Sequence, residues 1–222
     1  MLDRRLQTVA DLVRDGSRVA DIGTDHALLP CALVAAGRCP SAVASDIRVG
    51  PTEAAQRTVA ANGLEQTVSV RLGAGLQTVS PDEVDDIVIA GMGGETIASI
   101  LEDAVWTKDS HYRLVLQPMT RPERLRRFLY DNGFDIQTET VVKDGRRLYT
   151  VLCITYSGVV RQFEEAVYYI GKMDAKQGKE YLETVRRRLQ KEQVHANASL
   201  STCIERIEAY IQQQWNPWED DQ

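Results

Sequence analysis

Short apolar segments alternate with helical segments through most of the chain, and this alternation limits the possible folds more than any other feature. The apolar segments, predicted as strands, cover residues 18–22, 42–46, 68–71, 86–90 and 112–117. The segments predicted as helices cover residues 2–14, 31–36, 51–62, 95–102 and 122–132. Strands and helices alternating at these lengths form a parallel sheet with helices on both faces.

Two further strand-like segments, residues 136–143 and 148–156, flank Asp144-Gly145, a dipeptide typical of hairpin turns. This hairpin adds an antiparallel strand to the sheet. A closing hairpin fits the Rossmann-like methyltransferase arrangement better than the all-parallel dinucleotide-binding one. We therefore predict an α/β fold whose first domain, residues 1–158, is of the Rossmann-like class I methyltransferase type.

Beyond Gly158 the strand signals stop and a helical pattern takes over. Two sets of apolar residues spaced by three and four positions match each other there: Leu182, Val185 and Leu189, and Leu200, Ile204, Ile207 and Ile211. This spacing predicts a second domain, residues 159–222, built as a C-terminal α-helical, coiled-coil-like hairpin. Packing against another subunit and contact with a substrate are both open as its role.

The composition narrows the class of protein. Hydrophobic residues make up 43% of the chain and charged residues 26%, as in ordinary globular proteins. No apolar run approaches a membrane span or a signal peptide, and the four cysteines and three histidines are scattered, without metal-ligand spacing. We expect a cytoplasmic protein with reduced thiols, no metal and no membrane association. The net charge of −6 argues against a nucleic-acid partner overall, although several basic residues cluster locally.

The turn after the first strand reads Asp21-Ile-Gly-Thr-Asp-His26. A glycine there lets the backbone approach a nucleotide-like ligand. A dinucleotide would require a Gly-x-Gly-x-x-Gly pattern to hold its pyrophosphate, but Asp25 and Leu28 occupy the second and third glycine positions. S-adenosylmethionine carries a sulfonium and an ammonium instead of phosphates, so the carboxylates of Asp21 and Asp25 favour it as the cofactor.

The next strand ends support a nucleoside cofactor. Asp46 ends the second strand, where an acidic side chain can accept hydrogen bonds from both ribose hydroxyls. Gly73-Ala-Gly-Leu76 follows the third strand, where adenine would lie. Gly91-Met-Gly-Gly94 follows the fourth, where an acceptor would meet the methyl group. This loop has no side chain that accepts the hydrogens of an exocyclic amine, which favours a ring nitrogen as acceptor.

These strings, with Leu116-Gln-Pro-Met119, resemble the bacterial TrmK family, whose members are tRNA (adenine-22) N1-methyltransferases. The resemblance implies a Rossmann-like methyltransferase domain with a C-terminal coiled-coil-like domain. It implies that the following residues bind the cofactor: Asp21, Gly23, His26, Asp46, Ile47, Gly73, Ala74, Gly75, Leu76, Gly91, Met92 and Gly93. Related methyltransferases often have Asp or Asn at position 74 to contact the adenine amine, and Ala74 cannot make that contact.

Given this resemblance, we hypothesise direct methyl transfer to N1 of adenine in tRNA, with the base unpaired or flipped out. Asp25 would stabilise the positive charge that develops on the base, and His26 would position it or relay a proton, although His26 could equally be structural. The residues expected to bind the substrate are Gly94, Gln117, Pro118, Met119, Arg121, Arg124, Arg127, Arg146 and Arg147, with Arg126 and Arg186 to Arg188 as further phosphate contacts.

Two alternatives stay open from the sequence. The chain could methylate a small molecule or a protein, in which case its activity would need no RNA and would depend weakly on salt. It could also be a non-catalytic module that binds S-adenosylmethionine and recruits a partner through its tail. The apolar stripe of the tail is short, which favours a monomer.

Overall fold

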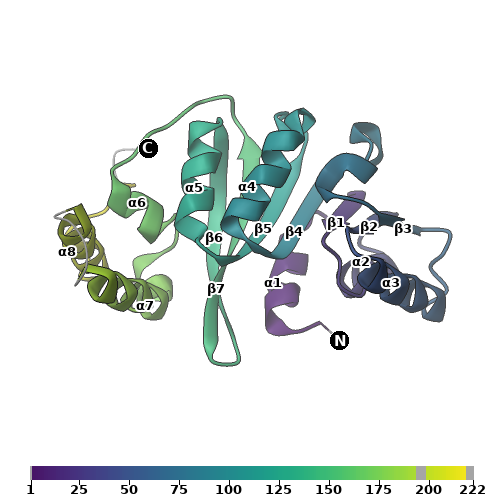
Figure 1. The fold of residues 1–222 in the computed structure, drawn as a ribbon, viewed down its shortest axis with the longest axis horizontal. Helices are drawn as coiled ribbons and strands as arrows, with labels where there is room; N and C mark the ends of the chain where they lie inside the picture. Colours follow the sequence, from purple (N-terminus) through teal and green to yellow (C-terminus); the bar gives the residue numbers. More distant parts are fainter. Residues whose placement is uncertain (1, 194–198, 219–222) are drawn as a thin grey trace.

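The structure is a computed structural model that describes residues 2–193 and 199–218. Its centre is a seven-stranded sheet in the order β3-β2-β1-β4-β5-β7-β6 (Figure 1). The strands are β1 (Val19–Ile22), β2 (Ala42–Asp46), β3 (Val68–Leu72), β4 (Asp86–Gly93), β5 (Arg113–Thr120), β6 (Phe134–Asp144) and β7 (Arg147–Tyr156). The first five strands run parallel, and β7 is antiparallel to both β5 and β6. The predicted fold class and closing hairpin are confirmed.

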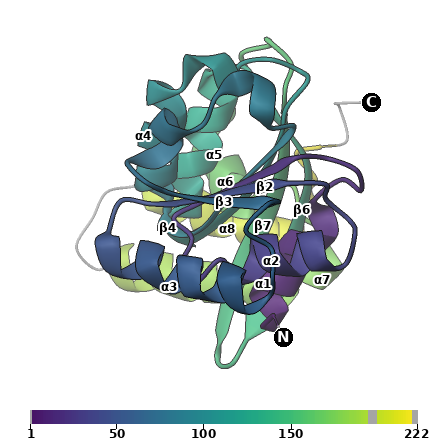
Figure 2. The ribbon, with the colours of Figure 1, turned by 90° about the vertical axis from the view of Figure 1, so that its right-hand side faces the viewer.

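Helices cover both faces of this sheet. They are α1 (Arg4–Leu12), α2 (Leu28–Ala35), α3 (Val49–Ala61), α4 (Gly94–Asp103) and α5 (Pro122–Asp131). Figure 2 shows α1, α2 and α3 on one face and α4 and α5 on the other.

Successive residues of the central strands enter opposite cores. In β4, Ile87 and Ile89 pack with α4 and α5, whereas Val88 packs with α1, α2 and α3. A parallel sheet buried on both faces needs such uninterrupted apolar strands, and this is the pattern by which the sequence predicted it.

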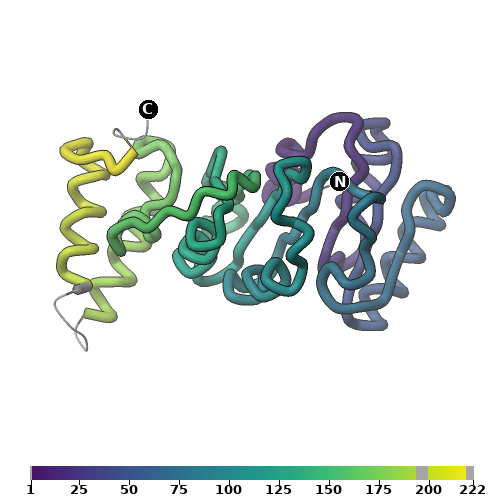
Figure 3. Tube along the Cα trace, turned by 90° about the horizontal axis from the view of Figure 1, so that it is seen from above, coloured from purple at the N-terminus to yellow at the C-terminus, as the bar shows by residue number. Residues whose placement is uncertain are grey.

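The tail forms a third core at the β6 end of the sheet (Figure 3). It contains α6 (Glu165–Ile170), α7 (Ala175–Gln193) and α8 (Ser199–Ile211). The apolar faces of α7 and α8 meet, with Leu182 and Leu189 on one helix and Ile204 and Ile207 on the other. The predicted helical tail is confirmed, while its coiled-coil character and the boundary at residue 158 stay predictions. Val141 and Leu148 of the β6–β7 hairpin also pack into this core.

Strands β4 and β5 both continue past the ends that the sequence predicted. The predicted fourth strand ends at residue 90, but β4 continues through the glycine cluster to Gly93. The predicted fifth strand ends at residue 117, but β5 continues to Thr120. Glycine and proline usually interrupt strands. Here the pairing register shifts between Ala90 and Met92 and between Met92 and Gly93, which accommodates the glycines and the proline. Met92 then pairs with Pro118 and Gly93 with Thr120.

The starts of two helices also differ from the prediction. α2 begins at Leu28, three residues earlier than predicted, with Pro30 in its first turn, and α3 begins at Val49, ahead of Pro51. Proline is tolerated in a first helical turn because the backbone N–H groups there have no intrahelical acceptor, so its missing N–H costs no hydrogen bond. None of the described helices combines the length and the apolar character that crossing a bilayer requires.

Candidate active site

The carboxyl ends of β1, β2, β3 and β4 surround a cleft of about 310 Å³. It lies where the chain, having built β1, β2 and β3 outward, returns to place β4 on the other side of β1. Open α/β sheets bind ligands at such a switch point. The lining residues are Ile22, Gly23, Asp46, Ile47, Arg48, Gly73, Ala74, Gly75, Ala90, Gly91, Met92, Thr96 and Ile100.

The end of β1 brings a buried carboxylate beside this cleft. Asp21 is 7% exposed, and burial raises its pKa to about 6. A hydrogen bond with Thr24 and the positive charge of Arg5 oppose that rise, whereas Asp46 adds to it. The backbone amides of Gly23 and Thr24 donate to the Ser45 carbonyl at 2.7 and 2.9 Å, which ties the loop to β2.

Gly23 explains why the loop needs a glycine. Its φ is +76°, in the left-handed region that residues with a Cβ rarely adopt. The side chain of Met92 crosses the position that a Cβ on Gly23 would occupy. The end of β1 and the end of β4 are therefore in contact on this side of the cleft.

Asp46 at the end of β2 presents the second carboxylate, which is 5% exposed. Its Oδ1 accepts hydrogen bonds from the Arg48 backbone amide at 2.8 Å and from Arg48 Nε at 3.3 Å. Within the described residues, Oδ2 makes no hydrogen bond. Beside it the Ile47 side chain is 67% exposed and supplies an apolar surface. A carboxylate oxygen next to an apolar wall suits a ribose and its base.

The segment after β3 forms the opposite wall. The Gly73 amide donates to the Asp46 carbonyl at 3.0 Å, and Gly75 has a φ of +51° with Ile100 3.2 Å from where its Cβ would lie. Leu76, predicted to touch the cofactor, is instead buried in the core between the sheet, α4 and α5. Ala74 offers the cleft no polar side-chain group.

The end of β4 is held by Gln117, which is held in turn by Arg5, a residue that the sequence analysis did not identify. The Gly91 amide donates to Gln117 Oε1 at 3.1 Å, and Arg5 Nη1 of α1 donates to the same oxygen at 2.9 Å. Gln117, predicted to bind the substrate, is instead fully buried in β5, and both ends of its amide group are bonded within the protein. Arg5 precedes Gln117 by 112 positions and belongs to no motif, so no local pattern in the sequence could have indicated it.

The two predicted catalytic residues are exposed. Asp25 and His26 lie in the loop between β1 and α2, with side chains 78% and 53% exposed and 3.7 Å between His26 Nε2 and Asp25 Oδ2. Neither lines the cleft. Ala27, which follows them, is buried with a φ of +52°, a strained conformation for a residue with a side chain. Ala27 is the residue at which the loop ends and α2 begins.

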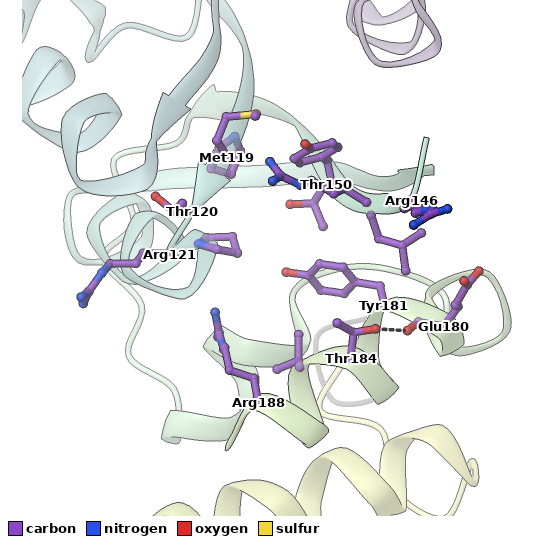
Figure 4. A pocket seen from close by; sticks show the side chains of 15 residues that line it. Met119, Thr120, Arg121, Arg146, Thr150, Glu180, Tyr181, Thr184 and Arg188 are labelled. Carbon is purple, nitrogen blue, oxygen red and sulfur yellow. Dashed lines mark hydrogen bonds between the residues drawn. The ribbon is translucent and has the colours of Figure 1, made fainter. Parts of the chain in front are cut away.

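A larger groove of about 570 Å³ lies between the carboxyl end of β5, the β6–β7 hairpin and α7 (Figure 4). Its lining includes five of the predicted substrate residues, Pro118, Met119, Arg121, Arg146 and Arg147. Met92, which lines the cleft, pairs with Pro118, which lines the groove, so the two hollows lie at neighbouring strand ends of the sheet.

The tail supplies the second wall of this groove. Figure 4 shows Tyr181 and Arg188 projecting from α7 towards the strands that carry Met119 and Thr150. Tyr149 of β7 also lines it. Arg188 is among the predicted phosphate contacts, whereas no pattern in the sequence indicated Tyr149 and Tyr181, because the groove exists only once α7 packs beside the hairpin.

The predicted phosphate-binding arginines separate into distinct groups. Arg121, Arg124, Arg146 and Arg147 are exposed, and Arg121 lies 3.8 Å from Glu95. Arg127 pairs with Glu165 and stacks on Tyr168, while Arg186 pairs with Glu208 between α7 and α8. Arg127 therefore links α5 to α6, and Arg186 links the two long helices of the tail.

The prediction for Arg126 is wrong. Its side chain is 1% exposed on the inner face of α5 and bonds Glu139 Oε1 at 2.5 Å through Nη2. Nη1 donates to the Tyr168 carbonyl at 2.6 Å. A cluster of arginines in the sequence does not indicate that one of them faces inward on α5. Gly94, also predicted to contact substrate, is buried beneath the Arg121 backbone.

The residues at the cleft fit S-adenosylmethionine. Buried Asp21 and Asp46 offer two carboxylates, of which one suits an ammonium and the other a ribose, and glycines at positions 73 and 75 leave room beside Ile47 for adenine. Within the described part of the chain, no group of three or more His, Cys, Asp or Glu side chains is arranged as metal ligands would be.

Known proteins share this arrangement. Residues 2–152 match the family described as methyltransferase domain. A tRNA (adenine(22)-N(1))-methyltransferase of Bacillus subtilis strain 168 is 40% identical over 151 residues, which are 68% of this chain and 63% of that protein. The match thus spans less than two thirds of that relative's length.

Solved structures extend the likeness through the tail. A putative tRNA (m1A22) methyltransferase of Streptococcus pneumoniae, solved with S-adenosyl-L-methionine, has a TM-score of 0.85 at 32% identity, covering 95% of this chain and 100% of that one. TrmK of M. capricolum, solved with S-adenosyl-homocysteine, has a TM-score of 0.81 at 27% identity, covering 96% and 98%. This chain therefore belongs to the methyltransferase-domain family and, within it, to the TrmK family of S-adenosylmethionine-dependent methyltransferases.

Proposed function

We propose that this enzyme transfers a methyl group to N1 of an adenine in tRNA, at position 22 in the D-loop region. The observation that carries the proposal is the groove beside the cofactor cleft, whose rim holds Arg121, Arg146, Arg147 and Arg188. Such a rim suits a phosphate backbone. The 40% identity to the Bacillus subtilis enzyme of that specificity supports the same acceptor.

The acceptor chemistry agrees with the residues at the cleft. S-adenosylmethionine, when bound, supplies a methyl group made electrophilic by its sulfonium. N1 of adenine has a lone pair in the ring plane, so no protein base has to remove a proton first. Gly91 and Met92 at the end of β4 leave the space for a planar ring without offering an acceptor for an exocyclic amine. N1 lies on the pairing edge, so the base must be unpaired.

Different residues of the chain would hold the cofactor and stabilise the charge on the acceptor. Asp21 would hold the cofactor's ammonium and Asp46 its ribose hydroxyls. Asp25 is the proposed stabiliser of the charge that develops on the base, because a carboxylate lowers the barrier to forming a cation. His26, in contact with Asp25, would position it. Both side chains are exposed in the structure, so this role depends on the bound acceptor covering their loop.

The groove would take the RNA next to the target base. Tyr149 and Met119 form its apolar wall, and the arginines of the rim would contact phosphates. The apolar faces of α7 and α8 are used within the chain, which supports a monomer. We expect the enzyme to act in the cytoplasm, where its substrate is.

Methylation of unmodified tRNA transcripts, followed by nucleoside mass spectrometry, tests the proposal. We expect 1-methyladenosine, and we expect it to disappear when adenine 22 is replaced. Cofactor binding without any methylation of tRNA would contradict the proposal and favour a binding module. Methylation of a small molecule or protein that needs no RNA would favour another acceptor.

A further inference from the structure

Arg5 lies where α1 passes beneath the carboxyl ends of β4 and β5, and its side chain is 18% exposed. The carboxylate of Asp3 orients it from one side, at 3.6 Å between Asp3 Oδ2 and Arg5 Nη2. Asp3 Oδ1 also accepts from the Leu6 amide at 2.7 Å and so caps α1. The guanidinium is therefore held by the same residue that fixes the start of its helix.

From there the contacts lead directly to the cleft. Arg5 Nη1 and the Gly91 amide both donate to Gln117 Oε1, at 2.9 and 3.1 Å. Gln117 Nε2 donates to the Pro118 carbonyl at 2.9 Å, so its amide group is used at both ends. Gly91 has a φ of +82°, and no side chain of its own can hold it in place. Its peptide depends on Gln117, and Gln117 depends on Arg5.

We propose that Arg5 is a positioning residue of the methyl-transfer site, which fixes the Gly91 peptide through Gln117 without itself touching the cofactor or the acceptor. The inference rests on the proposed function for its effect on turnover and on the cofactor cleft alone for its effect on binding. Without Arg5, the buried Gln117 oxygen keeps one donor instead of two, and the end of β4 becomes free to shift.

Arg5 has a second effect, on the charge of the cofactor-binding carboxylate. The groups that face Asp21 are Arg5 from α1, Asp46 from β2, Thr24 from the loop and Cys31 from α2. Arg5 is the only cation among them. Its positive charge lowers the pKa of Asp21 against the effect of burial, so its removal raises the pH below which Asp21 cannot hold an ammonium.

The test uses the full chain and two readouts. Calorimetry with S-adenosylhomocysteine across pH measures the acid limb of cofactor binding, and single-turnover methylation of tRNA measures transfer. For Arg5→Ala we expect the acid limb to move to higher pH, because the charge that lowers the pKa of Asp21 is removed. We expect single-turnover transfer to fall by about 10- to 100-fold with the KM for tRNA little changed.

Three companion variants separate positioning from general destabilisation. Arg5→Lys retains the charge and should restore the acid limb, but only part of the transfer rate, because lysine lacks the planar donor pair. Gln117→Ala should lower transfer and leave the acid limb unmoved. Arg4→Ala, from the same turn of α1 with an exposed side chain, should match the wild type in both readouts.

The outcomes decide the inference independently of the acceptor. If Arg5→Ala binds S-adenosylhomocysteine with an unshifted acid limb and transfers at the wild-type rate, the inference is wrong. A lower melting temperature with both readouts unchanged would reduce Arg5 to a structural residue and equally overturn it. If the wild type methylates no tRNA, the proposed function fails, yet the calorimetric comparison still tests Arg5.

Discussion

Asp21 illustrates at the scale of one residue how a binding site lowers stability. Burial raises its pKa from 3.8 to about 6, so the folded protein penalises the ionised form. The contribution of Asp21 to stability is thus fully present below about pH 4 and is lost as pH rises through 6. The carboxylate that we propose to hold the cofactor's ammonium in its charged form is therefore kept at a cost in the free protein.

Asp21→Asn should remove that cost. We expect the variant without cofactor to be more stable than the wild type by about 1–3 kcal/mol near pH 8, since each pKa unit corresponds to about 1.4 kcal/mol. The difference should vanish towards pH 4, and cofactor binding should be lost. Urea unfolding at both pH values measures this. A variant less stable than the wild type near pH 8 would contradict it.

Ala74 is the second residue whose effect can be predicted. It lines the cofactor cleft in an extended conformation, with φ −87° and ψ 126°, which Asn adopts without strain. Ala74→Asn offers the adenine amine an acceptor, and one hydrogen bond is worth about 1 kcal/mol, so cofactor affinity should rise about fivefold. Calorimetry with S-adenosylhomocysteine measures it. Unchanged or weaker binding would mean that adenine does not lie against position 74.

At the scale of secondary-structure elements, the start of α4 depends on a glycine. A Cβ on Gly94 would lie 2.5 Å from the Arg121 carbonyl oxygen, so the β5–α5 turn and α4 approach each other at backbone distance. Backbone cannot yield as a flexible side chain can. The close approach links the first turn of α4, next to the cofactor cleft, to Arg121 at the edge of the groove.

Gly94→Ala should therefore lower the free energy of unfolding by about 1–3 kcal/mol. Gly50→Ala in α3 is a matched control, because nothing lies within 4 Å of its Cβ position and its φ is not in the left-handed region. That control should be neutral or stabilising by up to about 1 kcal/mol. Denaturant unfolding of the two variants compares them directly. An equally stable Gly94→Ala would show that the turn can move aside.

Elements whose signals are local could be predicted from the sequence. Three features could be recognised from a few neighbouring residues, because turn geometry and strand ends depend on local sequence. They are the glycine turn after β1, Asp46 at the end of β2 and the Asp144-Gly145 turn. Arg5 and Tyr181 reach the site only through packing across the whole sheet or against the tail. The same limit explains Arg126, since a charge run does not reveal which face of a helix is buried.

At the scale of the molecule, the groove joins the two parts of the chain in one surface. Arg146 and Arg147 stand on the β6–β7 hairpin, opposite Arg188 of α7. Changing Arg146 and Arg147 together to Glu should raise the KM for tRNA by about tenfold, with a smaller change in kcat, because phosphate contacts act mainly on binding. Kinetics at two salt concentrations measure this.

Arg57→Glu serves as the control for that variant. Arg57 is exposed on α3, which Figure 1 shows at the far end of the sheet from α7. Its reversal changes the net charge without touching the groove. An unchanged KM in the double variant, or an equal rise with Arg57→Glu, would mean that RNA does not follow the groove.

The buried pair of Arg126 and Glu139 connects the methyltransferase domain to the tail. Arg126 donates to Glu139 and to the Tyr168 carbonyl, while the Lys172 amide donates to Glu139 Oε2 at 2.9 Å. Glu139→Gln leaves a buried guanidinium without its counter-charge and should cost about 3–5 kcal/mol. Lys143→Gln, which breaks an exposed pair with Glu180, should cost less than about 1 kcal/mol.

Thermal unfolding and hydrogen exchange of residues 165–193 check this difference. We expect faster exchange there in Glu139→Gln than in Lys143→Gln. Equal stability of the two variants would mean that the buried pair does not hold the tail.

This pair also bears on how the family could have diversified. Gly171 lies so close to it that a Cβ would be 2.4 Å from Glu139 Oε2 and 2.7 Å from Arg126 Nε. A tail exchanged by simple fusion would have to bring carbonyls and a glycine to meet the buried Arg126, and without them the arginine would lose its partners. Positions 126, 139 and 171 should therefore be inherited as a unit, and a chimaera that splits them should fold poorly.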